Sequence, residues 1–175
     1  MPKTLIIYST TDGQTRKICL RLQQILEQQN NLVTLISVTE SDSVNLSIFD
    51  KIIIGASIRY GKHNKNIYEF INTNRAMLES KVNAFFSVNV VARKPNKDTP
   101  ETNPYLKRFL SQVSWHPKKL AVFAGKIEYQ KYTFWDRTII RLIMWITKGP
   151  TDPKANIEFT DWEKVNKFGE ALSKM

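Results

Sequence analysis

The sequence contains few of the residues that metal sites and covalent catalysis usually need. It has one cysteine, Cys19, and two histidines, His63 and His116. A single cysteine excludes an intramolecular disulfide, and its helical face, shared with Leu22 and Leu26, predicts that it is buried. Neither histidine belongs to a recognisable catalytic triad, and we expect His63 at the surface. We therefore predict no metal site and no catalytic side chain.

The sequence also lacks long apolar runs. None approaches the ~20 residues that span a bilayer, and Met1–Thr4 leads directly into a predicted strand, which leaves no room for a signal peptide. We expect one domain over residues 1–175, made in the cytoplasm and remaining on that side. Positive charge is in excess, because 26 Lys and Arg against 16 Asp and Glu give a net charge of +10. This charge favours nucleic acid, an anionic membrane surface or an anionic substrate as partner.

Strand and helix patterns alternate along the chain. We expect strands at Thr4–Tyr8, Leu32–Val38, Lys51–Ser57, Val82–Asn89 and Leu120–Gly125. We expect helices at about Gln14–Gln28, around Ile67–Leu78, from near Pro100, and after a capping box at Thr160–Glu163. The continuous β-branched run in the third strand fits a strand buried on both faces, as parallel sheets require. The pattern predicts a doubly wound α/β fold that binds ligands at the carboxyl ends of its strands.

A basic, aromatic insertion at about 126–153 interrupts this alternation. Residues 91–119 have a net charge of +5 and residues 126–148 a net charge of +3, so the charge is focused. The pattern predicts a helix from about Thr133 to Thr147 whose apolar face contains Trp135, Ile139, Leu142, Ile143 and Ile146. Such a helix either lies in a membrane interface or packs its apolar face on the sheet. The positions of Phe134 and Trp145 favour the interface, where we expect membrane or quinone contacts from Trp135, Arg137, Ile139, Arg141, Leu142 and Trp145.

Three loops follow the first, third and fourth predicted strands and could hold a flat cofactor with one phosphate. The first contains hydroxyls, one glycine and a helix start: Ser9, Thr10, Thr11, Asp12, Gly13, Gln14 and Thr15. Because it has no lysine and the GxxxxGK[ST] pattern is absent, a monophosphate fits better than ATP, although an ordinary capped turn is the alternative. The second loop offers a tyrosine for stacking: Ser57, Ile58, Arg59, Tyr60 and Gly61. The third offers backbone groups for the ring edges: Ser87, Val88, Asn89, Val90, Val91, Ala92 and Arg93. FMN matches this description.

These loops also carry a family resemblance. The first is similar to the phosphate loop of flavodoxins, which bind FMN at a switch point of the sheet. Nearly the whole chain resembles the bacterial quinone-dependent protoporphyrinogen IX dehydrogenases, through Ser9–Arg16, Ile54–Gly61, Ser87–Pro95, Thr99–Asn103, Trp135–Arg137 and Thr160–Trp162. The resemblance implies a flavodoxin-like five-stranded sheet of order 2-1-3-4-5 and FMN-dependent oxidation of protoporphyrinogen IX in haem biosynthesis. It also implies electron transfer to menaquinone or ubiquinone by a peripheral protein on the cytoplasmic side of the bacterial inner membrane.

Particular residues can be related to this substrate. Protoporphyrinogen carries propionates, so we predict that Arg59, Arg93 or Lys94, on loops that flank the flavin, pairs with one. Asp12 replaces a threonine that is usual in flavodoxins, and we expect it to cap the helix or face solvent, away from the phosphate. His63 could alternatively relay protons near the flavin.

Three other functions stay open. An electron-carrying flavodoxin would be expected to be acidic, and an NAD(P)H-dependent quinone reductase would use the same scaffold. A basic nucleic-acid-binding protein would have no cofactor. We predict no nucleic-acid partner, and the oligomeric state is open.

Overall fold

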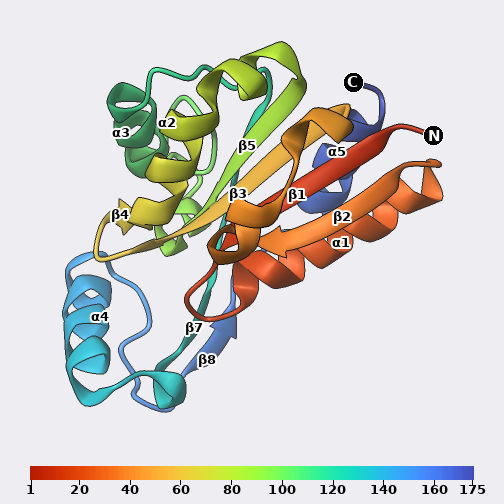
Figure 1. The fold of residues 1–175 in the computed structure, drawn as a ribbon. Coiled ribbons are helices and arrows are strands. Elements are labelled where there is room, and N and C mark those ends of the chain that lie inside the picture. The colour runs from red at the N-terminus through yellow and green to blue at the C-terminus, as the bar shows by residue number, and fades with distance from the viewer.

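The structure is a computed structural model that describes residues 1–175. Its centre is a parallel sheet in the order β2-β1-β3-β5-β6 (Figure 1). These strands are β1 (Lys3–Ser9), β2 (Leu32–Ser37), β3 (Lys51–Arg59), β5 (Val82–Val88) and β6 (Leu120–Phe123). The short strand β4 (Lys62–His63) pairs antiparallel with the end of β3. The predicted doubly wound order is therefore confirmed, with β5 and β6 as its fourth and fifth strands.

Helices cover both faces of the sheet because successive residues of each strand point to opposite faces. On one face, Ile6 shares a core with α1 (Gln14–Gln28) and α5 (Trp162–Ser173). On the other face, Leu5 and Ile7 share a core with α2 (Lys65–Ser80) and α3 (Pro104–Gln112). Cys19 is fully buried in the first of these cores, as predicted.

One predicted helix start and one predicted helix cap are wrong. Helix α3 begins at Pro104, not near Pro100, because the Asn103 side chain accepts hydrogen bonds from the first amides of that helix. Helix α5 is capped by Asp161, which accepts from the Lys164 amide at 3.1 Å. Thr160 instead donates to the carbonyl of Ala124 at 2.7 Å, so the predicted capping box does not form.

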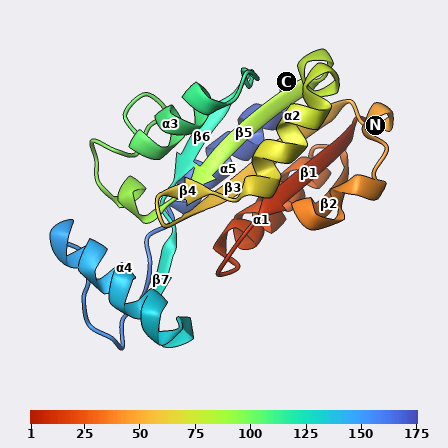
Figure 2. The same ribbon diagram turned by 60° about the vertical axis from the view of Figure 1, so that its left-hand side comes forward.

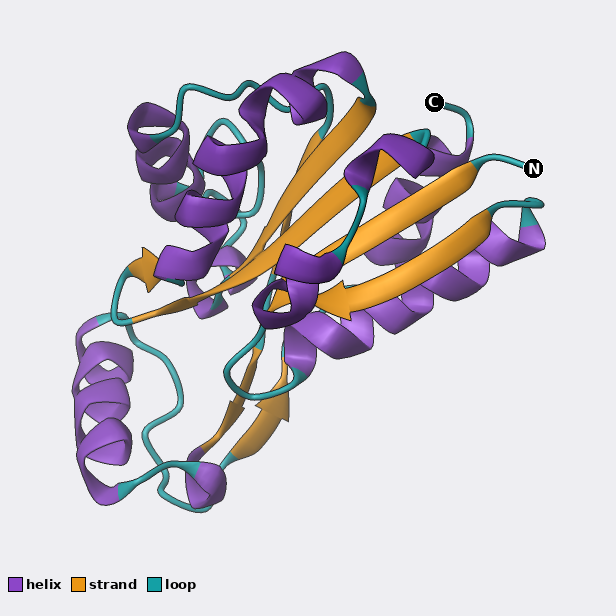
Figure 3. Cartoon of the chain, in the orientation of Figure 1, coloured by secondary structure: helices purple, strands orange, loops and turns teal.

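The insertion extends beyond the carboxyl ends of the strands, as Figures 1 and 2 both show. An antiparallel ribbon of β7 (Lys126–Glu128) and β8 (Asn156–Glu158), which the sequence did not predict, carries it (Figure 3). Helix α4 (Phe134–Ile146) confirms the predicted insertion helix, and the Thr133 hydroxyl caps it by accepting from the Asp136 amide. The alternative in which this helix packs its apolar face on the sheet is wrong, because that face is largely exposed. None of the helices has the length and apolar content that crossing a bilayer requires.

Short 3-10 segments complete the connections. They are η1 (Val38–Ser43), η2 (Leu46–Ile48), η3 (Val90–Arg93) and η4 (Tyr129–Lys131). Segment η3 follows β5 at the carboxyl edge of the sheet, and η4 leads from the ribbon toward α4. Segment η3 therefore stands at the edge of the sheet that faces the insertion, whereas η4 lies at the outer end of the insertion (Figure 1).

Candidate functional site

The three predicted loops meet at one cavity at the carboxyl edge of the sheet. The cavity is open to solvent, contains about 830 Å³ of empty space, and is lined by both the loops and the insertion. Of the predicted residues, the lining includes Thr10, Thr11, Asp12, Gln14, Thr15, Ser57, Ile58, Arg59, Tyr60, Gly61, Val88, Asn89, Val90 and Val91. It does not include Ser9, Gly13, Ser87, Ala92 or Arg93.

The first loop has hydrogen-bond donors suited to a phosphate. Gly13 has a φ of 86°, donates to the Thr10 hydroxyl at 3.0 Å, and has open space where a Cβ would stand. The first amides of α1 follow, and helix amides at this position have no partner within the helix. The hydroxyl oxygen of Thr15 is buried and has no hydrogen-bond partner. A buried unpaired hydroxyl beside free amides fits a bound monophosphate.

Asp12 connects the first loop to the second. Its carboxylate accepts a hydrogen bond from Arg59 Nη2 at 2.7 Å, and Gly13 rather than Asp12 occupies the cap position of α1. Of the two expectations for Asp12, the helix cap is wrong, whereas exposure to solvent is confirmed. Burial raises the pKa of the Asp12 carboxyl, and the Arg59 guanidinium opposes that change. The same guanidinium lies 5.2 Å from the ring centroid of Tyr132, so this ion pair also contacts the insertion.

The second loop is a tight turn between β3 and β4. Tyr60 and Gly61 have φ angles of 51° and 76°, the positive values that favour a two-residue hairpin turn. Tyr60 lines the cavity and is 51% exposed. Its ring is therefore accessible to a flat ligand at the cavity.

The third loop is fixed by a buried chain of hydrogen bonds. His63 Nε2 lies 2.9 Å from the Ser87 hydroxyl, which accepts from Asn89 Nδ2 at 3.2 Å, and Asn89 also pairs with Asn103. His63 is 5% exposed, so the predicted surface position is wrong. Burial lowers the pKa of His63 to about 3. A neutral ring can accept the Ser87 proton, which gives every donor in the chain an acceptor.

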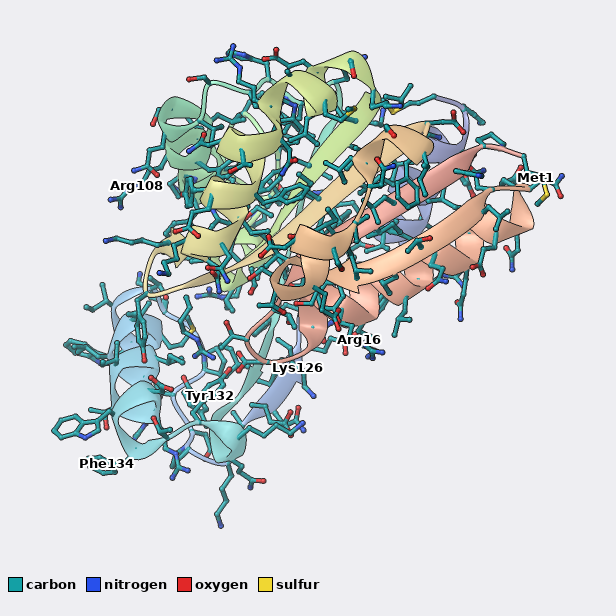
Figure 4. All side chains as sticks on the ribbon, in the orientation of Figure 1. Met1, Arg16, Arg108, Lys126, Tyr132 and Phe134 are labelled. Atoms are coloured by element: carbon teal, nitrogen blue, oxygen red, sulfur yellow. The ribbon has the colours of Figure 1, made fainter.

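The far wall of the cavity comes from the insertion and includes residues that sequence reasoning missed. The insertion supplies Lys126, Ile127, Tyr132, Ile140, Ile143 and Met144, and two further lining residues that were missed, Tyr105 of α3 and Gly125 after β6, belong to the main fold. Figure 4 shows Tyr132 and Lys126 between α4 and the edge of the sheet. Ile143, predicted on the same apolar face as Trp135 and Leu142, is instead partly buried and lines the cavity. The spacing of Ile140, Ile143 and Met144 gave no usable signal, because nine of the thirteen residues of α4 are apolar and form more than one apolar face.

The outer face of α4 carries exposed aromatic and aliphatic side chains. Phe134, Trp135 and Trp145 are each exposed by more than 70%, and Figure 4 shows Phe134 pointing away from the protein. Ile139, Leu142 and Ile146 are also exposed. The predicted contacts Trp135, Ile139, Leu142 and Trp145 therefore share one accessible face.

The predicted basic residues have other contacts. Arg137 donates to the carbonyl of Tyr129 and Arg141 to that of Thr151. Arg93 donates to the carbonyl and hydroxyl of Thr147, at the end of α4. Neither Arg93 nor Lys94 lines the cavity, whereas Arg59 and Lys126 do. Lys126 forms an ion pair with Glu128 at 3.0 Å.

Comparison with known proteins shows the family to which the chain belongs. The flavodoxin domain family matches residues 5–154. The chain is 40% identical over 171 residues to a protoporphyrinogen IX dehydrogenase (quinone) of Escherichia coli (strain K12), covering 98% of this chain and 94% of that protein. It is 39% identical over 168 residues to the Leishmania major protein of the same name, covering 95% and 73%.

Solved flavodoxins share the fold. The two-electron reduced Megasphaera elsdenii flavodoxin has a TM-score of 0.57 at 11% identity, covering 98% of this chain and 99% of that one. Oxidised Flavodoxin 2 from Bacillus cereus has a TM-score of 0.57 at 16% identity, with 98% of both chains covered. The chain therefore belongs to the flavodoxin family and, within it, to the quinone-dependent protoporphyrinogen IX dehydrogenases.

Proposed function

We propose that this protein uses FMN to oxidise protoporphyrinogen IX to protoporphyrin IX and passes the electrons to a respiratory quinone. One observation carries the proposal: a single cavity joins a phosphate-type loop to an apolar wall supplied by α4. The bound flavin would supply the redox chemistry, while the protein binds and orients the reactants. The substrate, the acceptor and the reaction come from the names of relatives that align with nearly the whole chain.

Membership of the flavodoxin family indicates a flavin, and the first loop supports FMN in particular. FMN has one phosphate, and Thr15 offers a buried hydroxyl without a partner beside the start of α1. The loop from Ser9 to Thr15 contains no lysine, so hydroxyls and amides would hold that phosphate. Tyr60, exposed at the second loop, would stack on the flavin ring.

The rest of the cavity suits a flat, apolar second reactant. Ile140, Ile143 and Met144 form an apolar wall opposite the three loops. Arg59 is the best placed of the three predicted propionate partners, because it lines the cavity and Arg93 and Lys94 do not. Release of Arg59 from Asp12 would let its guanidinium bind a propionate carboxylate, a pairing that is frequently bidentate.

The outer face of α4 supports peripheral attachment to the cytoplasmic side of the bacterial inner membrane. Trp135, Leu142 and Trp145 are exposed on one face of a segment whose net charge is +3. Apolar burial at the interface and attraction to anionic lipid would then act together. We expect the protein to sediment with phosphatidylglycerol vesicles, and about 0.5 M salt to weaken this binding. Equal binding to phosphatidylcholine vesicles would contradict the contribution of charge.

Anaerobic mixing tests the reaction itself. Protoporphyrinogen added to the FMN-loaded protein should bleach the flavin absorbance, and a quinone added afterwards should restore it. An NAD(P)H-dependent quinone reductase would be bleached by NAD(P)H and not by the porphyrinogen. An electron carrier would need a separate dehydrogenase before any bleaching, and a nucleic-acid-binding protein would show no flavin absorbance. Absence of bleaching by protoporphyrinogen would overturn the proposed reaction.

A further inference from the structure

Helix α4 is held to the rest of the protein by its inner face and by hydrogen bonds near both ends. Its outer face is exposed, while Met144 on its inner face is buried in a small apolar cluster with other side chains of the insertion and borders the cavity. Near its first turns, Arg137 donates to the carbonyl of Tyr129 within the insertion. At its other end the tie comes from outside the insertion, from Arg93 in η3.

Arg93 uses its guanidinium to join two walls of the cavity. Nη1 donates to the carbonyl of Val90 at 3.0 Å, on the wall formed by the third loop. Nη2 donates to the carbonyl of Thr147 at 3.1 Å and lies 3.2 Å from the Thr147 hydroxyl. The guanidinium carbon lies 5.9 Å from the ring centroid of Phe159, and burial lowers the pKa of Arg93. A cation that donates to carbonyls at a helix C-terminus is also favoured by the helix dipole.

Gly149 leaves the space that this arrangement needs. A Cβ at Gly149 would lie 2.6 Å from Met144 Sδ and 2.8 Å from Arg93 Nη2. The chain reaches this position through Lys148, whose φ is 55°, and the Gly149 amide donates to the carbonyl of Met144 at 2.7 Å. The end of α4 therefore places a glycine beside Arg93, and Met144, one of the two side chains it abuts, lines the cavity.

We propose that Arg93 is a positioning residue that sets the distance between η3 and α4. This distance in turn sets the width of the part of the cavity that receives protoporphyrinogen. Arg93 acts through Val90 and Thr147. It does not bind a propionate, which is the role that the sequence alone had suggested. Lysine could not replace it fully, because an ammonium cannot donate to both walls in the fixed geometry of a guanidinium. This inference rests on the proposed function for its kinetic test, but the position of α4 can be measured without substrate.

Two variants disrupt this contact from opposite sides. Arg93→Lys removes the bridge and keeps the charge, whereas Gly149→Ala keeps Arg93 and places a methyl group against it. Both should raise KM for protoporphyrinogen about tenfold, since hydrogen bonds to a charged group are lost or strained. The dissociation constant for FMN should change by less than about twofold, because the phosphate loop is untouched. Arg108→Ala is the matched control, since Arg108 lies exposed on α3 and points outward (Figure 4).

Amide hydrogen exchange on the FMN-loaded protein provides the substrate-independent measurement. The amides of Ile140–Thr147 should exchange about tenfold faster in both variants and at the wild-type rate in Arg108→Ala. If Arg93 instead bound a propionate, Arg93→Ala would raise KM while Gly149→Ala left both KM and exchange unchanged, which would overturn the inference. Faster exchange in a protein that does not oxidise protoporphyrinogen would support the positioning role and reject only the proposed reaction.

Discussion

Helices α1 and α4 are both amphipathic, but they use their apolar faces in opposite ways. In α1, Ile18, Leu22 and Leu26 are fully buried against the sheet, while polar residues such as Lys17 face solvent. In α4, the widest apolar face is directed outward and a second one borders the cavity. The sheet with its helices thus buries its own apolar surface. The insertion leaves apolar surface for ligands on one side and an external surface on the other.

The two regions also differ in how their polar groups are satisfied. In the third loop, the side chains of Ser87, Asn89 and Asn103 bond to one another below the cavity. The insertion is tied to neighbouring backbone by separate arginines, among them Arg93 and Arg141. A shared buried network stiffens its surroundings, whereas single contacts can be broken one at a time. We therefore expect substitutions in the core to change global stability, and substitutions in the insertion to change binding.

Gly55→Ala should produce the largest loss of stability. A Cβ at Gly55 in β3 would lie 2.2 Å from Cζ of Phe86, on a ring that is fully buried. The free energy of unfolding should fall by about 3 kcal/mol because the core has no space for another methyl group. Urea unfolding of the apoprotein measures this, with Gly149→Ala for comparison. Equal losses for the two variants would show that the insertion unfolds together with the core.

Thr15→Val should affect the cofactor and spare the fold. The variant keeps the shape of the side chain and removes a buried hydroxyl that has no partner in the protein. FMN affinity should fall by about 2 kcal/mol, or roughly 30-fold in Kd, if that hydroxyl binds the phosphate. Fluorescence titration of the apoprotein with FMN measures the change, and riboflavin, which lacks the phosphate, is the control ligand. A similar loss with riboflavin would place the effect elsewhere.

His63→Gln should change how stability depends on pH. Because the pKa of His63 is about 3 in the folded protein, the unfolded chain takes up a proton below its ordinary pKa of 6.5 that the folded chain does not. Wild-type stability should therefore fall as pH decreases from about 6 to 4, by at most about 1.4 kcal/mol per unit from this residue. The variant should lose this part of the slope, as measured by urea unfolding at several pH values. An unchanged slope would contradict a neutral buried imidazole.

The succession of strands and helices along the chain was predictable because each core element carries its own local signal, whereas the order of the strands in the sheet was implied by the family resemblance. The β-branched run at Lys51–Ile54 and the spacing of Ile18, Leu22 and Leu26 are visible without tertiary contacts. Errors arose where a distant partner decided the outcome. Thr160 bonds to Ala124 instead of capping α5, and His63 is packed against Phe85 and Phe109.

The candidate site was predictable only on its core side. Its loops follow strands, so their meeting at one edge follows from the topology of a parallel sheet. The wall from the insertion could not be predicted, because a helix as apolar as α4 does not reveal which face turns inward. Arg93 shows the same difficulty. Its positive charge suggested a contact with a ligand, but its guanidinium donates to the carbonyls of Val90 and Thr147.

Substitutions on the outer face of α4 should change the free energy of unfolding least and should still weaken membrane binding. We expect the double variant Trp135→Gln, Trp145→Gln to change the free energy of unfolding by less than about 0.5 kcal/mol, because both side chains are exposed. Its binding to phosphatidylglycerol vesicles should fall about tenfold or more, since each indole would otherwise bury apolar area in the interface. Ile48→Gln, at an exposed position in η2 on the main fold, is the matched control and should bind vesicles as the wild type does. A loss of stability in the double variant would instead mean that α4 packs its outer face against protein, and the contrast with α1 would disappear.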